Sequence, residues 1–251
     1  MSGDTVRRTR RERRAATLAS RREDRRQPAT RPARRIGLGT ISALAVIIGL
    51  AVIGFMILTR PGAATPTASV IPAAVPAGLV SSGFTLGKAD APVTIDVFED
   101  FQCPACQRWG HDVFPSLARN ELSDGRAKLV FHGDAFIGPE SQNAGRAAWA
   151  ASRQNRFWDY WATLYANQGL RENGGAFTRD RLVAMADAIG LEPTMFGLDY
   201  ESDAAKQAVA DGVAAARQAG VESTPTILVN GERFTGATYP DLAAVVDAAV
   251  K

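Results

Sequence analysis

The stretch PVTIDVFEDFQCPACQRW, from Pro92 to Trp109, contains the only two cysteines of the 251-residue chain. Its first residues are largely apolar and β-branched, which predicts a buried strand ending near Phe98. The residues that follow Cys106 place apolar side chains at roughly helical spacing, which predicts a helix. Cys103 therefore lies where a strand turns into a helix.

The Cys103-Pro104-Ala105-Cys106 motif has the features of a reactive thiol pair. Proline suits the first position of a helix, because a backbone N–H has no helical partner there. Cys103 then falls at or next to the N-cap, where free backbone N–H groups point towards its sulfur. Such placement lowers a cysteine pKa from about 8.5 to between roughly 3.5 and 7.5. Cys103 is thus the expected nucleophile, and Cys106 is the expected resolving thiol.

Two other interpretations of the cysteines remain open. A structural disulfide between Cys103 and Cys106 would close a very short loop and would constrain the unfolded chain little. A zinc site needs four ligands, and the remaining candidates are His111 and His132, whose separation does not fit the usual spacing of zinc ligands. A cycling dithiol is the favoured interpretation, and we expect neither a metal nor another cofactor.

The chain begins with a strongly basic segment. Residues 1–35 contain 13 arginines and four acidic residues, a net charge of +9, whereas the whole chain carries +3, so residues 36–251 carry −6. Basic blocks can bind phosphates, but no aromatic side chain is interleaved among these arginines. We therefore expect no nucleic-acid partner, and we assign this tail a role in orienting the chain at a membrane.

Residues 36–58 form an uncharged apolar stretch of 23 residues, from Ile36 to Leu58. At about 1.5 Å per residue, a helix of this length crosses a hydrocarbon core of roughly 30 Å. The arginines before it predict a cytoplasmic N-terminus. We expect a single-pass protein of the cell membrane whose catalytic domain is extracytoplasmic. Cleavage as a signal peptide stays open, although such signals carry only roughly 7–15 apolar residues.

The remainder divides into a linker and one domain. Residues 59–82 are rich in proline and alanine and lack periodicity, which predicts a semi-stiff spacer. Residues 83–251 predict an α/β domain with strands at Val93–Phe98 and Lys128–Gly133, a helical insertion at about 141–219, a hairpin turning at Asn230-Gly231 and a final helix. This order of elements is that of a thioredoxin-type domain with an insertion.

Two motifs carry a resemblance to a known family: FEDFQCPACQRW, beginning at residue 98, and ESTPTILVNGERFTGA, beginning at residue 222. Together they resemble the membrane-anchored branch of the DsbA-like thiol-disulfide oxidoreductases, over roughly residues 84–251. The resemblance implies a thioredoxin fold with a helical insertion. It also implies that Cys103 attacks, that Cys106 resolves, and that Pro225 is a cis proline facing them, with Thr224 beside the sulfurs.

The sequence departs from this family at the residue that handles protons. Thioredoxin and the best-known DsbA proteins carry a buried carboxylate six residues before the nucleophile, and that position is Val97 here. Glu99 and Asp100 are the nearest substitutes. A carboxylate there can carry a proton to or from Cys106. The alternative is that both are ordinary exposed acids of a loop.

The predicted function is thiol-disulfide exchange outside the cytoplasm, where disulfides persist. We expect an enzyme, a protein disulfide oxidoreductase that introduces disulfides into reduced or unfolded exported proteins. The resemblance implies reoxidation by a membrane quinone-linked protein. Two alternatives remain: a reductase or isomerase that keeps exported thiols reduced, and a membrane-tethered chaperone or binding module in which the cysteines are incidental.

Overall fold

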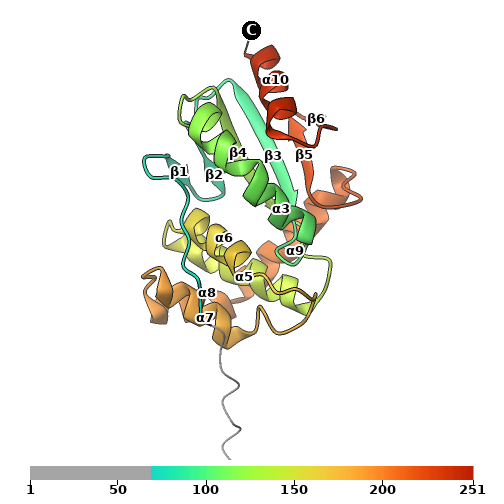
Figure 1. The fold of residues 1–251 in the computed structure, drawn as a ribbon. Coiled ribbons are helices and arrows are strands. Elements are labelled where there is room, and N and C mark those ends of the chain that lie inside the picture. Colours follow the sequence, from blue (N-terminus) through green and yellow to red (C-terminus); the bar gives the residue numbers. More distant parts are fainter. Residues whose placement is uncertain (1–68, 251) are drawn as a thin grey trace, which may run out of the picture. The chain divides into compact units, whose positions relative to one another are not determined.

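A mixed six-stranded sheet is at the centre of residues 69–250, the part of the chain that the computed structural model describes (Figure 1). Its strands stand in the order β1-β2-β4-β3-β5-β6. They are β1 (Ser81–Ser82), β2 (Thr85–Leu86), β3 (Val93–Glu99), β4 (Ala127–Gly133), β5 (Thr226–Val229) and β6 (Glu232–Arg233).

Strand β3 is in the middle of the sheet and leads into the cysteine motif. It pairs in parallel with β4, ending with Glu99 opposite Gly133, and antiparallel with β5, where Phe98 lies opposite Thr226. Its apolar, β-branched residues suit a strand that is covered on both faces. Because β5 runs the other way, the segment before β5 and the motif after β3 meet at the same end of the sheet.

Helices cover the sheet and form a separate group beside it. They are α3 (Pro104–Asp112), α4 (Phe114–Leu117), a π-helical turn (Ala118–Leu122), α5 (Pro139–Arg153), α6 (Phe157–Ala166), α7 (Arg179–Ala188), α8 (Pro193–Glu201), α9 (Asp203–Gln218) and α10 (Tyr239–Ala249). Helices α5–α9 form the insertion, in which α5 packs against α6, α8 and α9. Figure 1 shows this group below the sheet, at the end where β3 leads into α3. The insertion therefore adjoins the cysteines, and α6 contacts α3 directly.

The hairpin between β5 and β6 turns as the sequence predicts. Asn230 and Gly231 have positive φ angles of 49° and 86°, the conformation that a type I′ turn requires at both central positions. The Asn230 side-chain oxygen accepts a hydrogen bond from Thr94 N–H at 2.8 Å, which ties the turn to β3. The predicted strands and the predicted insertion also lie within two residues of the observed bounds, so the predicted order of elements is confirmed.

Residues 69–80 run along α6 without forming a helix or strand of their own. Ile71 N–H donates to Asn167 Oδ1 at 2.9 Å, and Asn167 Nδ2 donates back to the Ile71 carbonyl oxygen at 2.7 Å. Ala73 makes the same pair of bonds with the Thr163 hydroxyl, at 3.1 and 3.0 Å. Residues 69–82, which we expected in the linker, thus pack on the domain: α6 and its C-cap bind the backbone of Ile71 and Ala73, and Ser81–Ser82 form β1.

The other predictions for the N-terminal part concern residues outside the described region. The basic tail (1–35), the expected membrane span (36–58) and the first part of the linker all precede residue 69. Within residues 69–250, no helix combines the length and the apolar character needed to cross a bilayer.

Two helical glycines provide a matched test of how tightly the insertion packs on the sheet. A Cβ added to Gly212, in α9, would collide with the Gly133 carbonyl oxygen at the end of β4, whereas one added to Gly197, in α8, would meet nothing within 4 Å. We expect Gly212→Ala to lower the free energy of unfolding by roughly 1–3 kcal/mol, because backbone cannot move aside easily. Gly197→Ala should raise it by up to about 1 kcal/mol through helix propensity. Urea denaturation measures the free energy of unfolding of both variants. Equal changes in the two would contradict the close contact between Gly212 and the Gly133 carbonyl oxygen.

Candidate active site

Cys103 lies at the N-cap of α3, where the chain has left β3 and the helix begins. Its backbone is extended, with φ −70° and ψ 120°, and Pro104 occupies the first turn. Cys103 is 8% exposed, and its Sγ lies 3.2 Å from the Thr224 carbonyl oxygen, to which the thiol donates when it is protonated. The peptide bond between Thr224 and Pro225 is cis. The sulfur is thus held between a helix N-terminus and the segment that enters β5.

The pKa of the Cys103 thiol is lowered from its ordinary value of 9.0 to about 5. The largest cause is a hydrogen bond from the Cys106 thiol; Thr224 and the backbone N–H groups of Cys106 and Ala105 act in the same direction, while burial opposes them. Thr224 Oγ1 is buried and has no hydrogen-bond partner among the described residues. Its hydroxyl is therefore available to donate to the sulfur once the sulfur carries a negative charge.

Cys106 lies one turn further along α3 and is fully buried. Burial raises the pKa of its thiol, and the hydrogen bond to Cys103 and the charges of Glu99 and Cys103 raise it further. The two thiols therefore differ at neutral pH, since Cys103 is ionised and Cys106 is protonated. A thiolate next to a protonated partner thiol is the arrangement that thiol-disulfide exchange requires.

Glu99, the last residue of β3, is a buried carboxyl group near the cysteines. It is 1% exposed, and Trp161 Nε1–H donates to its Oε2 at 2.8 Å. Its Oε1 has no hydrogen-bond partner among the described residues. Burial raises the pKa of Glu99 from 4.5 to about 8, against the lowering effect of the Trp161 hydrogen bond, and the charge of Cys103 adds to the rise. Glu99 therefore holds a proton at neutral pH.

The alternation of side chains along β3 explains why this carboxyl group lies near the sulfurs although Val97 occupies the family position. Successive residues of a strand point to opposite faces, so Val97 and Glu99 share one face. Val97 is fully buried. Glu99 lies on the same face of β3 as Val97, two residues closer to Cys103 in the chain.

Asp100 is also 1% exposed, but its carboxylate faces the backbone of a neighbouring loop. Oδ1 accepts hydrogen bonds from Gln102 N–H at 2.8 Å and from the Ser141 hydroxyl at 2.6 Å. Oδ2 accepts from the N–H groups of Phe136 and Ile137, both at 3.0 Å. Asp100 therefore fixes the loop that follows β4 and the start of α5. Neither acid is the exposed loop residue that the alternative interpretation expected.

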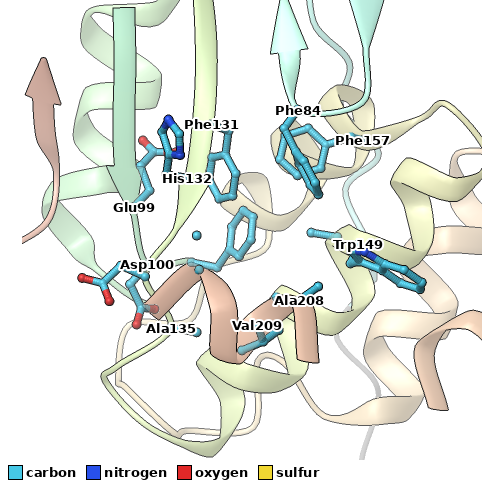
Figure 2. A pocket seen from close by; sticks show the side chains of 16 residues that line it. Phe84, Glu99, Asp100, Phe131, His132, Ala135, Trp149, Phe157, Ala208 and Val209 are labelled. Atoms are coloured by element: carbon cyan, nitrogen blue, oxygen red, sulfur yellow. The ribbon is translucent and has the colours of Figure 1, made fainter. Parts of the chain in front are cut away.

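Glu99 and Asp100 also form part of the wall of a cavity of about 190 Å³. Figure 2 shows these two acids on one side of the cavity and Phe84, Phe157 and Trp149 on the other. Apolar and aromatic side chains make up most of the lining. A carboxylate is poorly solvated in such surroundings, which accounts physically for the raised pKa of Glu99.

Cys103 opens onto a surface groove, which we call the Cys103 groove. It is lined by Cys103, Phe136, Ile137, Glu172, Glu222, Ser223 and Thr224. The Phe136 side chain is 54% exposed, although a large aromatic residue is usually buried. The groove combines an apolar surface, two acids and the nucleophile, so an extended peptide that lies in it can reach the sulfur.

The two histidines considered as zinc ligands have other surroundings. His132 Nε2 pairs with Asp96 Oδ1 at 2.8 Å, and the His132 ring stacks on Phe98 with 4.5 Å between ring centroids. His111 is exposed in the last turn of α3. Within residues 69–250, no three His, Cys, Asp or Glu side chains gather as a metal site requires.

Comparison with known proteins assigns the chain that carries this cysteine site to a family. The family described as thioredoxin matches the chain over residues 80–248, which include both cysteines and the cis proline. The chain belongs to the thioredoxin family. Among its relatives is a probable disulfide bond formation protein D of Bacillus cereus, 31% identical over 151 residues that cover 59% of this chain and 69% of the relative. Disulfide bond formation protein D of Bacillus subtilis is 28% identical over 172 residues, which cover 66% of this chain and 76% of the relative.

Solved structures agree with this assignment to the thioredoxin family. Oxidised BdbD from Bacillus subtilis superimposes with a TM-score of 0.63 at 25% identity, covering 72% of this chain and 99% of BdbD. A thioredoxin-like oxidoreductase from Silicibacter pomeroyi gives a TM-score of 0.56 at 26% identity, covering 66% of this chain and 90% of that one. The chain is a DsbA-like disulfide oxidoreductase, so the predicted thioredoxin fold with a helical insertion and the predicted enzyme class are confirmed.

Within this thioredoxin fold, the structure groups most of the predicted site residues near the sulfurs. These are Cys103, Cys106, Glu99, Thr224 and Pro225. Trp161 was not predicted, although it donates the hydrogen bond that Glu99 receives. Nothing in the local pattern separates Trp161 from the other aromatic residues of the insertion. The groove residues Phe136, Glu172 and Glu222 were missed because only the fold brings these three loops together.

Proposed function

We propose that this protein introduces disulfides into reduced or unfolded exported proteins through its CPAC motif, as an oxidase and not as a reductase or isomerase. One observation carries the proposal: Cys103 lies at the N-cap of α3 beside the Cys106 thiol and Thr224, and these neighbours lower the pKa of its thiol to about 5. A stable thiolate favours the reduced pair, so that the disulfide form is readily reduced by a substrate. The name of these relatives, disulfide bond formation protein D, supports the same direction.

The proposed reaction consists of two thiol-disulfide exchanges. A substrate thiolate attacks Sγ of Cys103 in the Cys103–Cys106 disulfide, forms a mixed disulfide and releases Cys106 as a thiolate. Glu99 gives its proton to Cys106, because its pKa of about 8 keeps it protonated near neutral pH. A second substrate thiolate attacks the substrate sulfur of the mixed disulfide and releases Cys103, whose low pKa makes it a good leaving group. The substrate loses two electrons and the cysteine pair gains them.

We further propose that a membrane quinone-linked protein removes these electrons, and that residues 36–58 anchor the chain with its catalytic domain extracytoplasmic. The uncharged stretch of 23 residues and the 13 arginines before it support this topology. Labelling of Cys103 in intact cells by a membrane-impermeant maleimide tests it. Absence of labelling until the cells are lysed would contradict an extracytoplasmic domain.

The reduction potential of the full-length protein in detergent tests the direction of the reaction. We expect a value above about −180 mV in glutathione buffers, because the ionised Cys103 stabilises the reduced form. The fraction of reduced protein is read by alkylation and mass spectrometry. A potential near about −250 mV would instead match a reductase, and the oxidase proposal would have to be withdrawn.

A further inference from the structure

The Cys103 groove carries two acids and no base. Glu172 and Glu222 line it together with the nucleophile, and no lysine, arginine or histidine is among the lining residues. Both acids are exposed. Any substrate segment that brings a thiolate to Cys103 must therefore bring that negative charge towards two negative carboxylates.

Glu172 is held in place although it lies on a loop between α6 and α7. The next residue, Asn173, donates from its N–H to Gln102 Oε1 at 2.5 Å and accepts from Gln102 Nε2 at 3.2 Å. Glu140 accepts from the N–H groups of Gly175 and Phe177, at 2.6 and 2.8 Å. Because Gln102 directly precedes Cys103, these bonds fix the Glu172 loop against the residue next to the nucleophile.

Glu222 is placed by the turn that leads from α9 into β5. The turn begins where Val221 N–H donates to the Ala216 carbonyl oxygen at 2.9 Å. It ends where the Thr226 hydroxyl donates to the Ser223 carbonyl oxygen at 2.7 Å. The backbone on both sides of Glu222 is thus fixed, and the carboxylate stays beside the segment that contacts Cys103.

Neither carboxylate is neutralised by a neighbour. No hydrogen bond or ion pair joins Glu172 or Glu222 to another described residue. Arg171 directly precedes Glu172 but is exposed and forms no ion pair with it. On the Glu222 side, Arg233 donates instead to the Gly220 carbonyl oxygen at 2.9 Å and to the Thr226 hydroxyl at 3.4 Å. Both carboxylates are therefore available to pair with a positive charge on an incoming molecule.

We propose that Glu172 and Glu222 select substrates, so that the Cys103 groove prefers peptide segments with a lysine or arginine within two residues of the reacting cysteine. This inference rests on the proposed function, since it concerns the substrate of the same site. A basic neighbour offsets the repulsion between the substrate thiolate and the two carboxylates, and it raises the local concentration of the peptide at the groove. The exposed Phe136 ring adds apolar contact to the stem of such a side chain.

The test uses three synthetic dithiol peptides that differ only in the residues flanking the first cysteine, which are lysine, glutamine or glutamate. The oxidised full-length protein is mixed with each peptide, and the rate constant of peptide oxidation is measured by acid quench and mass spectrometry. A basic neighbour also makes a thiol more reactive with any disulfide. Each rate is therefore divided by the rate of the same peptide with uncharged hydroxyethyl disulfide.

After this correction we expect the lysine peptide to react about tenfold faster than the glutamate peptide at low ionic strength, with the ratio falling towards one at about 0.5 M salt. In the double variant E172Q/E222Q the ratio of the lysine to the glutamate peptide should fall close to one. In E172K/E222K it should fall below one, so that the glutamate peptide reacts faster. A charge-matched control, D90N/E232Q, changes two exposed acids that do not line the groove and should keep the wild-type ratio.

The outcomes separate this inference from the proposed function. Equal corrected rates for all three peptides would overturn the selection by charge while leaving the oxidase intact. A ratio that survives in E172K/E222K would assign the preference to other residues and would also overturn it. If even the glutamine peptide is not oxidised, the proposed function itself fails.

Discussion

Replacing Cys106 with alanine is expected to raise the pKa of Cys103 from about 5 and to abolish turnover, since the Cys106 thiol is the largest cause of the low value. With a pKa of about 5 the thiolate fraction of Cys103 at pH 6 is roughly 10³-fold above that of an ordinary thiol. Alkylation of the reduced protein by iodoacetamide between pH 4 and 9 measures this directly. The wild-type rate should reach its plateau above about pH 6, and the C106A rate should still be rising there.

The serine variant C106S is the matched control for this prediction. Its hydroxyl retains a donor near the Cys103 sulfur, so its alkylation profile should lie between those of the wild type and C106A. Both variants should trap a mixed disulfide with substrate through Cys103, because no resolving thiol remains. An alkylation profile of C106A that coincides with the wild type would show that the helix N-terminus and Thr224 alone determine the pKa of Cys103.

The order of elements could be predicted because the signals are local. The β-branched run before Phe98 and the Asn230-Gly231 turn each fix a short segment by its own backbone preferences. The position of Cys103 at the N-cap of α3 could be predicted from a local signal too, since Pro104 marks the start of a helix. These predictions needed no knowledge of distant contacts.

The rest of the site depends on contacts between segments far apart in the chain. Glu99 becomes the buried acid because Trp161, 62 residues away, donates to it across the interface of β3 and α6. Asp100 has its role only because the backbone at Phe136 turns towards it, 36 residues away. A single sequence shows the residue types but not these pairings, and for that reason two adjacent acids with the same local surroundings could not be told apart.

Replacing Glu99 with glutamine should change the dependence of stability on pH. The pKa of Glu99 is about 8 in the folded protein and near 4.5 when unfolded, so the folded chain binds more protons between these values. Glu99 therefore contributes a fall in the free energy of unfolding of the reduced protein as pH rises from about 4.5 to 8, by roughly 4–5 kcal/mol. The Cys103 thiol, whose pKa is lowered from 9.0 to about 5, contributes a rise over an overlapping range, so the difference in free energy of unfolding between the wild type and E99Q shows the fall by itself. E99Q should lack this fall. It should be about as stable as the wild type near pH 4.5, because protonated Glu99 also carries an O–H without an acceptor at the Oε1 position, and more stable above pH 8, where the wild type holds a buried carboxylate. Urea denaturation in the presence of a reductant, at pH values from about 4.5 to above 8, measures the free energy of unfolding of both proteins.

The same variant tests whether Glu99 supplies the proton to Cys106. In the wild type, the rate of a single turnover of the oxidised protein with a peptide dithiol should decline as pH rises, after correction for ionisation of the peptide, because Glu99 loses its proton. The decline should come somewhat below pH 8, because the Cys103 charge that adds to the pKa of Glu99 in the reduced protein is absent from the disulfide. E99Q should react roughly 10²-fold more slowly at pH 7 and show no such decline. Trp161→Phe removes the hydrogen bond that lowers the pKa of Glu99, so its decline should move to higher pH. If E99Q and the wild type share one profile, the proton comes from water or from another group, and Glu99 acts only on stability.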